Sequence, residues 1–106
     1  MLNENEFIRK AAETLNRIEN LLLESGVDLD VEMVGDGVME IQFSNGSKIV
    51  VNRHQVAQEI WVAARSGGFH FRWNGLDWLE TRGGEALLPM LSRLVSSQAG
   101  EVVNLF

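Results

Sequence analysis

The chain has 106 residues, of which 45% are hydrophobic and 23% charged, with no cysteine and a formal net charge of −6. A chain of this length buries one core, so we expect a single domain over residues 1–106. The absence of cysteine excludes disulfides, thiolate zinc sites and an iron–sulfur cluster held by thiolates of this chain alone. The acidic balance argues against binding nucleic acid, whose phosphates require a basic surface.

The negative charge is concentrated in the first part of the chain. Ten of the fifteen carboxylates lie in residues 4–40 beside three bases, which gives this stretch a formal charge of −7 and the remainder about +1. Such asymmetry is typical either of a solvated acidic face or of a surface that holds cations or steers a basic partner. Charge alone does not decide between these two interpretations.

The sequence contains no sign of membrane attachment. No window approaches the roughly 18 apolar residues of a membrane-spanning helix, so we expect no membrane contact. The first seven residues, MLNENEF, are polar and acidic and therefore unlike a signal or transit peptide. We accordingly expect a cytoplasmic protein.

Residues 4–25 show the periodicity of an amphipathic helix. Apolar residues recur at spacings of three and four and form one stripe. The members of this stripe are Phe7, Ala11, Leu15, Ile18 and Leu22. Asn3 or Asn5 is a suitable N-terminal cap, and Ser25 followed by Gly26 is a suitable end.

From residue 27 the apolar period changes to two, which predicts strands at 27–33, 38–43, 47–52, about 58–64, 69–73 and near Trp78. Asn45-Gly46 is a strong hairpin signal between the second and third strands. Residues 85–98 predict a second helix, with Pro89 near its first turn. Terminal helices flanking a meander predict an α+β fold, a two-layer sandwich with both helices on one face of an antiparallel sheet of about six strands.

This architecture leaves one sheet face uncovered. If Ile60 and Val62 face the helices, then Glu59, Trp61 and Ala63 face water. A regular register adds further residues to this patch: Asn52, His54, His70 and Arg72. An exposed tryptophan among polar residues has the composition of a protein-interaction hot spot, although it could also be covered by a loop.

Several segments resemble the frataxin family in its bacterial, CyaY-type form. These segments are Asn45-Gly-Ser-Lys-Ile-Val-Val-Asn52-Arg53, Ile60-Trp61-Val-Ala, Gly67-Gly68-Phe69-His70-Phe71 and Gln98-Ala99-Gly100-Glu101. The resemblance covers nearly the whole chain and includes the acidic start and the helix–strands–helix order. The chain departs from the family pattern at the end of the first helix, where Leu22, Leu23 and Ser25 replace further acids, and at Glu59, where members often have Gln.

The resemblance implies an iron-binding, non-enzymatic protein of iron–sulfur cluster biogenesis. Such proteins bind ferrous and ferric iron weakly through carboxylates and need no organic cofactor. Their acidic ridge docks on basic residues of a cysteine desulfurase and its scaffold complex, and bacterial members modulate the desulfurase in response to iron. The resemblance also implies a monomer that can form oligomers with iron.

The resemblance and the strand pattern together define the candidate site residues. The residues that match the family's acidic ridge, and would bind iron, are Glu19, Glu24, Asp28, Asp30 and Glu32. The residues expected to contact a partner protein are Asp28, Asp30, Glu32, Asn52, His54, Glu59, Trp61, His70 and Arg72.

The spacing of the strand carboxylates indicates what kind of metal site they can form. Asp28, Asp30 and Glu32 share one face of an extended segment, with α-carbons roughly 6.5–7 Å apart. A hard cation needs several oxygens within about 2–2.6 Å, so a flat row supplies one or two per ion and water supplies the rest. We therefore expect weak, labile and unselective binding, and we interpret the patch more as a docking surface than as a high-capacity iron site.

The sequence offers little for catalysis, because the carboxylates are exposed and His54 and His70 have no implied nucleophile nearby. Three hypotheses therefore remain. The first is an iron-responsive adaptor of a cysteine desulfurase, and the second is a metallochaperone that donates iron to a scaffold or to ferrochelatase. The third is a metal-independent binding module that uses the face around Trp61.

Overall fold

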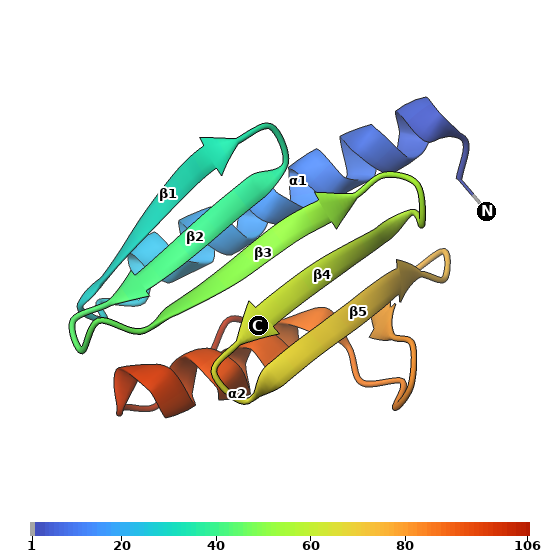
Figure 1. Cartoon of the computed structure of the whole chain (residues 1–106). Helices are drawn as coiled ribbons and strands as arrows, with labels where there is room; N and C mark the ends of the chain where they lie inside the picture. The colour runs from blue at the N-terminus through green and yellow to red at the C-terminus, as the bar shows by residue number, and fades with distance from the viewer. Residues whose placement is uncertain (1) are drawn as a thin grey trace.

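The protein is described by a computed structural model that covers residues 2–106. Two helices pack on one face of a six-stranded sheet, as predicted (Figure 1). The elements are α1 (Glu4–Glu24), β1 (Leu29–Gly35), β2 (Val38–Phe43), β3 (Lys48–His54), β4 (Glu59–Ala64), β5 (Gly67–Trp73), β6 (Trp78–Glu80) and α2 (Leu87–Ala99). The strands pair antiparallel in chain order, so every connection is a local hairpin. No helix within residues 2–106 is long and apolar enough to cross a membrane.

Helix α1 begins at a capping box, which identifies Asn3 as the cap from the two predicted candidates, Asn3 and Asn5. The Asn3 side chain accepts the backbone N–H of Glu6 at 2.8 Å, and the Glu6 carboxylate accepts that of Asn3 at 3.1 Å. These two bonds satisfy N–H groups that a helix start leaves without partners. All five residues of the predicted apolar stripe are buried, so the stripe attaches α1 to the sheet.

The core lies between the two helices and the inner face of the sheet. Met39, Ile41, Ile49, Val51 and Ile60 come from the central strands and are completely buried. The inward residues predicted for the second helix are buried as well: Leu87, Leu91, Leu94 and Val95. At about 25 cal/mol per Å² of apolar surface, this burial is the main force that holds the two layers together.

The C-terminal end of helix α2 is hydrogen-bonded to the sheet through one buried side chain, Gln98, which is 3% exposed. Its carbonyl oxygen accepts the backbone N–H of Arg65 at 2.9 Å, and its amide nitrogen donates to the hydroxyl of Ser47 at 3.1 Å and to the carbonyl of Lys48 at 3.2 Å. The backbone carbonyl of Gln98 also accepts the side chain of Asn45 at 2.8 Å. The end of α2 is thereby joined to the β2–β3 and β4–β5 hairpins.

The chain after α2 is more ordered than the sequence indicated, because it packs back on the helix. Val103 and Leu105 are buried. Their backbone N–H groups donate to the hydroxyls of Ser96 at 2.8 Å and Ser92 at 2.9 Å. The spacing of two between Val103 and Leu105 was the signal in the sequence from which their burial could have been predicted.

Several strand boundaries differ from the prediction, among them the start of β5, which is Gly67 instead of residue 69, and the end of β1, which is Gly35 instead of residue 33. β1 begins at Leu29 instead of residue 27, and β3 continues to His54 instead of ending at residue 52. The extension of β3 places His54 opposite Glu59 on β4. A register shift between Met33 and Gly35 ends the regular part of β1.

The connection from β6 to α2 is organised around the buried carboxylate of Glu80. This side chain, 6% exposed, accepts the backbone N–H of Gly83 at 2.6 Å and lies 3.4 Å from the Arg82 guanidinium. The N–H of Gly83, helped by Arg82, lowers the pKa of Glu80 below its ordinary value in spite of burial. The charged form of Glu80 therefore stabilises the fold.

We predict that Glu80→Gln lowers the free energy of unfolding by about 1 kcal/mol at neutral pH, because the bond to Gly83 loses its charge assistance. A lowered folded-state pKa contributes stability that is present above the unfolded carboxyl pKa and is lost as pH falls through the folded value. The difference between wild type and variant should therefore be complete near pH 6 and shrink below about pH 4. Urea unfolding at several pH values measures it.

Glu101→Gln is the matched control, because Glu101 is exposed and has the same chemistry. It should leave the stability curve unchanged. A Glu80→Gln penalty that stays constant down to pH 2 would contradict the role of the ionised carboxylate.

Candidate functional site

One face of the sheet points away from both helices, and we call it the outer face (Figure 1). The predicted site residues of the strands alternate with buried core residues, which places most of them on this face. The strand pairing places Asn52 on β3 opposite Trp61 on β4, and Trp61 opposite His70 on β5. In the same way Glu59 on β4 lies opposite His54 and Arg72. The structure thus brings together all six residues of the predicted sheet patch.

Trp61 forms the centre of an aromatic stack. Its indole ring lies 3.8 Å from the imidazole of His54, at 12° between planes, and 4.3 Å from that of His70, at 9°. The two histidines come from the neighbouring strands β3 and β5, so they cover opposite faces of the indole. Trp61 is therefore half-buried by two imidazole rings and not by a loop.

The prediction that the Glu59 side chain faces water is wrong. Glu59 is on the outer face by register, but its side chain is only 8% exposed because Trp61, His70 and Arg72 surround it. Its carboxylate accepts the indole N–H of Trp61 at 2.8 Å and a guanidinium N–H of Arg72 at 2.6 Å. The His70 Nδ1 atom lies 3.7 Å from the same carboxylate. The Arg72 guanidinium thus offsets the charge that the departure from Gln introduces.

The acidic part of the outer face is on β1 and β2. Asp30 and Glu32 alternate with the inward-facing Val31 along β1, and both are exposed. Glu32 lies directly opposite Glu40 of β2, whose carboxylate is 3.7 Å from Lys48. Like charges directly opposite one another across strands repel, so this corner of the sheet favours a bound cation or a basic partner.

The remaining predicted iron ligands lie outside β1, and of these only Asp28 is next to the row, because it directly precedes the strand. Asp28 lies in the α1–β1 connection and is exposed. Glu19 and Glu24 are five residues apart on α1, which separates them by about 140° around the helix axis. Glu24 lines the groove described below, whereas Glu19 is half-buried on another side of α1. Within residues 2–106, no three His, Asp or Glu side chains converge closely enough to chelate a metal ion.

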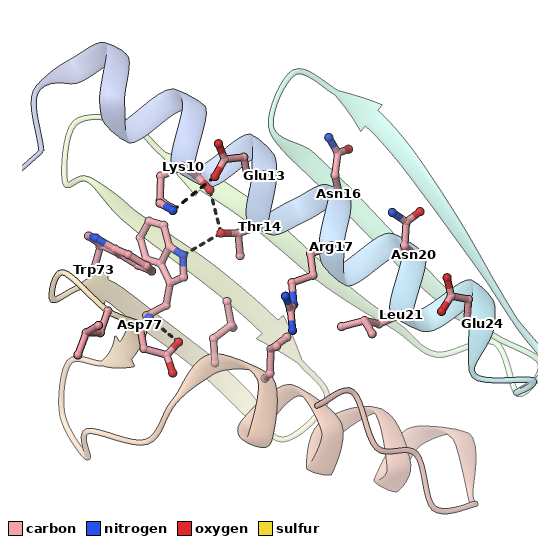
Figure 2. A pocket seen from close by; sticks show the side chains of 14 residues that line it. Lys10, Glu13, Thr14, Asn16, Arg17, Asn20, Leu21, Glu24, Trp73 and Asp77 are labelled. Carbon is pink, nitrogen blue, oxygen red and sulfur yellow. Dashed lines mark hydrogen bonds and ion pairs between the residues drawn. The ribbon is translucent and has the colours of Figure 1, made fainter.

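A groove of about 950 Å³ lies on the opposite side of the molecule, between α1, the β5–β6 connection and the start of α2 (Figure 2). Lys10 lies 4.7 Å from the centre of the Trp73 ring and 3.4 Å from the carboxylate of Glu13. The Trp78 indole N–H donates to the Thr14 hydroxyl at 2.9 Å. These contacts join α1 to the β5–β6 hairpin. The side chains in this part of the groove therefore stabilise the fold.

Comparison with known proteins shows the family of this chain. A family model described as "Frataxin-like domain" matches residues 1–101. A curated relative from Dechloromonas aromatica, "Iron-sulfur cluster assembly protein CyaY", is 50% identical over 104 residues, which is 98% of this chain and 99% of that protein.

The chain belongs to the frataxin family.

Solved frataxin structures share the fold. The frataxin from Psychromonas ingrahamii superimposes with a TM-score of 0.92 at 30% identity and covers 99% of both chains. A trimeric yeast frataxin solved in complex with ferrous iron is 20% identical and covers 95% of this chain and 88% of its own, with a TM-score of 0.63. The second likeness shows the fold alone.

Two features of this frataxin's outer face were not predicted from sequence. Glu40 was assigned to the second strand but not to the site, although a register that pairs the first two strands would have placed it opposite Glu32. The stacking of His54 and His70 on Trp61 was missed because His54 was expected beyond the end of its strand. Residue types were sufficient to identify the patch, but only the register shows which rings touch.

We predict that Glu59→Ala lowers the free energy of unfolding by about 1.5–3 kcal/mol, because the variant leaves the Trp61 indole N–H and the Arg72 guanidinium without their shared acceptor. Arg72→Ala is the matched control. Its removal leaves the Glu59 carboxylate bonded to the indole N–H of Trp61 and lets water reach the space of the Arg72 side chain, which is 60% exposed, so it should cost less than about 1 kcal/mol. Urea unfolding of both variants measures the difference, and equal costs would contradict the central role of Glu59.

Proposed function

We propose that this frataxin is an iron-binding protein of iron–sulfur cluster assembly that modulates a cysteine desulfurase and its scaffold in response to iron. The observation that carries the proposal is the outer face, where a row of exposed carboxylates on β1 lies on the same surface as the ordered Trp61 stack. The Dechloromonas relative, named for iron–sulfur cluster assembly, matches 98% of this chain.

Iron binding would occur at the acidic corner formed by Asp28, Asp30, Glu32 and Glu40. Each exposed carboxylate offers one or two oxygens, and water completes the coordination shell of Fe²⁺ or Fe³⁺. Because the carboxylates lie in a row and do not form a cage, the affinity is low and the exchange fast. Both properties suit a sensor of free iron better than an iron store.

Docking would use the same face. A basic surface of the desulfurase would approach the acidic corner, steered by its charge. The Trp61 stack would then supply apolar contact area for the scaffold, and its restrained rings lose little conformational entropy on binding. Iron bound at the corner would lower the negative charge and so change the affinity for the basic partner.

The chain would act without catalysing a reaction itself, as a monomer in the cytoplasm. Asp30 and Glu32 are exposed, and no nucleophile is paired with His54 or His70 among residues 2–106. Nucleophilic catalysis requires such a pairing, and general acid–base catalysis requires a side chain whose surroundings adjust its pKa to the reaction.

Two other functions remain as alternatives. A metallochaperone would pass iron to a scaffold or to ferrochelatase, and the exposure of the β1 carboxylates favours easy release. A metal-independent module would recognise its partner through the Trp61 stack alone, and the order of that stack favours it.

We predict that the double variant Asp30→Lys, Glu32→Lys weakens binding to the desulfurase by at least about tenfold, because it reverses the field that attracts a basic surface. Isothermal titration calorimetry with the purified desulfurase measures the affinity. The matched control, Glu13→Lys with Glu101→Lys, makes the same change in net charge away from the outer face and should retain most of the affinity.

Equal losses in the two double variants would show that net charge, and not the β1 row, determines docking. Unchanged binding in both, together with loss on Trp61→Ala, would instead support the metal-independent module.

We predict that anaerobic titration of the protein with Fe²⁺ perturbs NMR signals of Asp28, Asp30, Glu32 and Glu40 first. Signals of Glu24 should change less, because this side chain lines the groove away from the β1 row. Millimolar Fe²⁺ should also raise the melting temperature of wild type by relieving repulsion between the carboxylates. Uniform or absent NMR changes would contradict an iron site on this surface.

A further inference from the structure

Two hairpin turns of the sheet contain the dipeptide Asn-Gly. Asn45-Gly46 lies between β2 and β3, and Asn74-Gly75 lies between β5 and β6. Asparagine before glycine can cyclise, because glycine has no side chain that hinders attack by its backbone nitrogen on the asparagine side-chain carbonyl carbon. All four residues are exposed, so water and base reach both turns. A difference in reactivity between the turns must then come from their hydrogen bonds.

The side-chain carbonyl group is polarised in a similar way in both turns. The Asn74 side-chain oxygen accepts the backbone N–H groups of Leu76 at 2.9 Å and of Asp77 at 2.8 Å. The Asn45 side-chain oxygen accepts the backbone N–H of Ser47 at 2.9 Å and its hydroxyl at 2.6 Å. Two donors on this oxygen stabilise the negative charge that develops there when the carbonyl carbon is attacked. The carbonyl groups therefore do not distinguish the two sites.

The first turn holds both the attacking nitrogen and the leaving amide. The backbone N–H of Gly46 donates to the carbonyl of Phe43 at 3.0 Å. The side-chain nitrogen of Asn45 donates to the backbone carbonyl of Gln98 at 2.8 Å, which fixes this amide to helix α2. Cyclisation of Asn45 would break both bonds, so the fold opposes it.

Neither group is held in the second turn. Within residues 2–106, no hydrogen bond engages the backbone N–H of Gly75 or the side-chain nitrogen of Asn74. The turn is closed instead by the backbone N–H of Asn74, which donates to the carbonyl of Asp77 at 3.0 Å. Gly75 has a φ of +105°, which residues with a side chain rarely adopt. The turn therefore requires glycine at the position where glycine makes cyclisation easy.

We propose that Asn74 is a site of spontaneous deamidation and that the fold protects Asn45 from the same reaction. The Gly75 nitrogen gives its proton to a base and attacks the side-chain carbonyl carbon of Asn74. The bond from this carbon to the side-chain nitrogen breaks, and the nitrogen takes up a proton and leaves as ammonia. Water then opens the cyclic imide at either carbonyl, which yields aspartate or isoaspartate. The reaction needs no co-reactant besides water, and it is independent of the proposed docking function.

Isoaspartate in this turn would weaken the attachment of helix α1. The backbone of isoaspartate runs through the former side chain, which lengthens the turn by one carbon atom and displaces the oxygen that organises it. The β5–β6 pairing ends beside this turn at Trp73 and Trp78, whose rings lie 5.5 Å apart. Trp78 donates to Thr14 and Trp73 lies beside Lys10, so both rings contact α1 (Figure 2). Distortion of the turn should therefore make the modified protein less stable.

The first test compares the two sites within one molecule. The folded protein is incubated in mildly alkaline buffer and digested with trypsin, which yields residues 73–82 with Asn74 and residues 18–48 with Asn45. Mass spectrometry with fragmentation follows each conversion and distinguishes isoaspartate from aspartate. Asn74 should convert at least about tenfold faster than Asn45, because the barrier at Asn45 includes the loss of two hydrogen bonds.

Incubation in concentrated urea is the control, because unfolding removes both turns and leaves only the two dipeptides. The two rates should then become similar. Similar rates in the folded protein would overturn the inference. A rate difference that persists unchanged in urea would also overturn it, because the neighbouring sequence and not the fold would then be the cause.

The second test measures the consequence for the fold. Asn74→Ser keeps an oxygen that can accept an N–H of the turn but has no carbonyl carbon to attack. After the same incubation, wild type should contain a fraction that melts at lower temperature, in proportion to its isoaspartate content. Asn74→Ser should melt as it did before incubation. An unchanged melting temperature of wild type rich in isoaspartate, or an equal loss in both proteins, would overturn the inferred link between the turn and α1.

Discussion

The structure depends on one constraint: two helices cover a six-stranded sheet on one face only. The meander brings all six strands side by side, and both helices are used on the inner face to bury the core. The outer face must then be stable in water over most of its area. Polar residues and charge pairs meet this requirement on β1 to β3, but Trp61 on β4 needs a different solution.

That solution is provided by neighbours on adjacent strands. Glu59, Arg72 and the two histidines enclose Trp61 so that its ring faces are covered and its N–H is bonded. The result is an aromatic surface with fixed geometry, which costs less entropy to bind than a mobile side chain would. The same enclosure buries Glu59, so a charged residue becomes part of a small outer core. Stability and the proposed recognition therefore depend on the same contacts.

The sequence was sufficient to predict the layers, because each strand and helix has a clear period and most hairpins have glycine in or beside the turn, although the β3–β4 connection, residues 55–58, has none. The burial of Met39 and Ile41, for example, follows directly from alternation. Contacts that depend on strand register or on tertiary packing were harder to predict from the sequence. Alternation assigned Glu59 to the outer face correctly, but it could not show that Trp61 and Arg72 would bury it. The helix carboxylates show the same limit, since charge composition cannot tell on which side of α1 Glu19 and Glu24 lie.

The acidic residues of β1 also have a structural reason to be where they are. β1 is an edge strand, so the backbone groups along its free edge have no partner strand within the sheet. A second copy pairing at this edge would bring Asp30 and Glu32 against their own counterparts, and this repulsion discourages aggregation. A basic partner experiences attraction at the same edge. The same row of carboxylates thus repels a second copy of the chain and attracts positive charge, so protection of the edge and the proposed selection of a basic partner would follow from one electrostatic field.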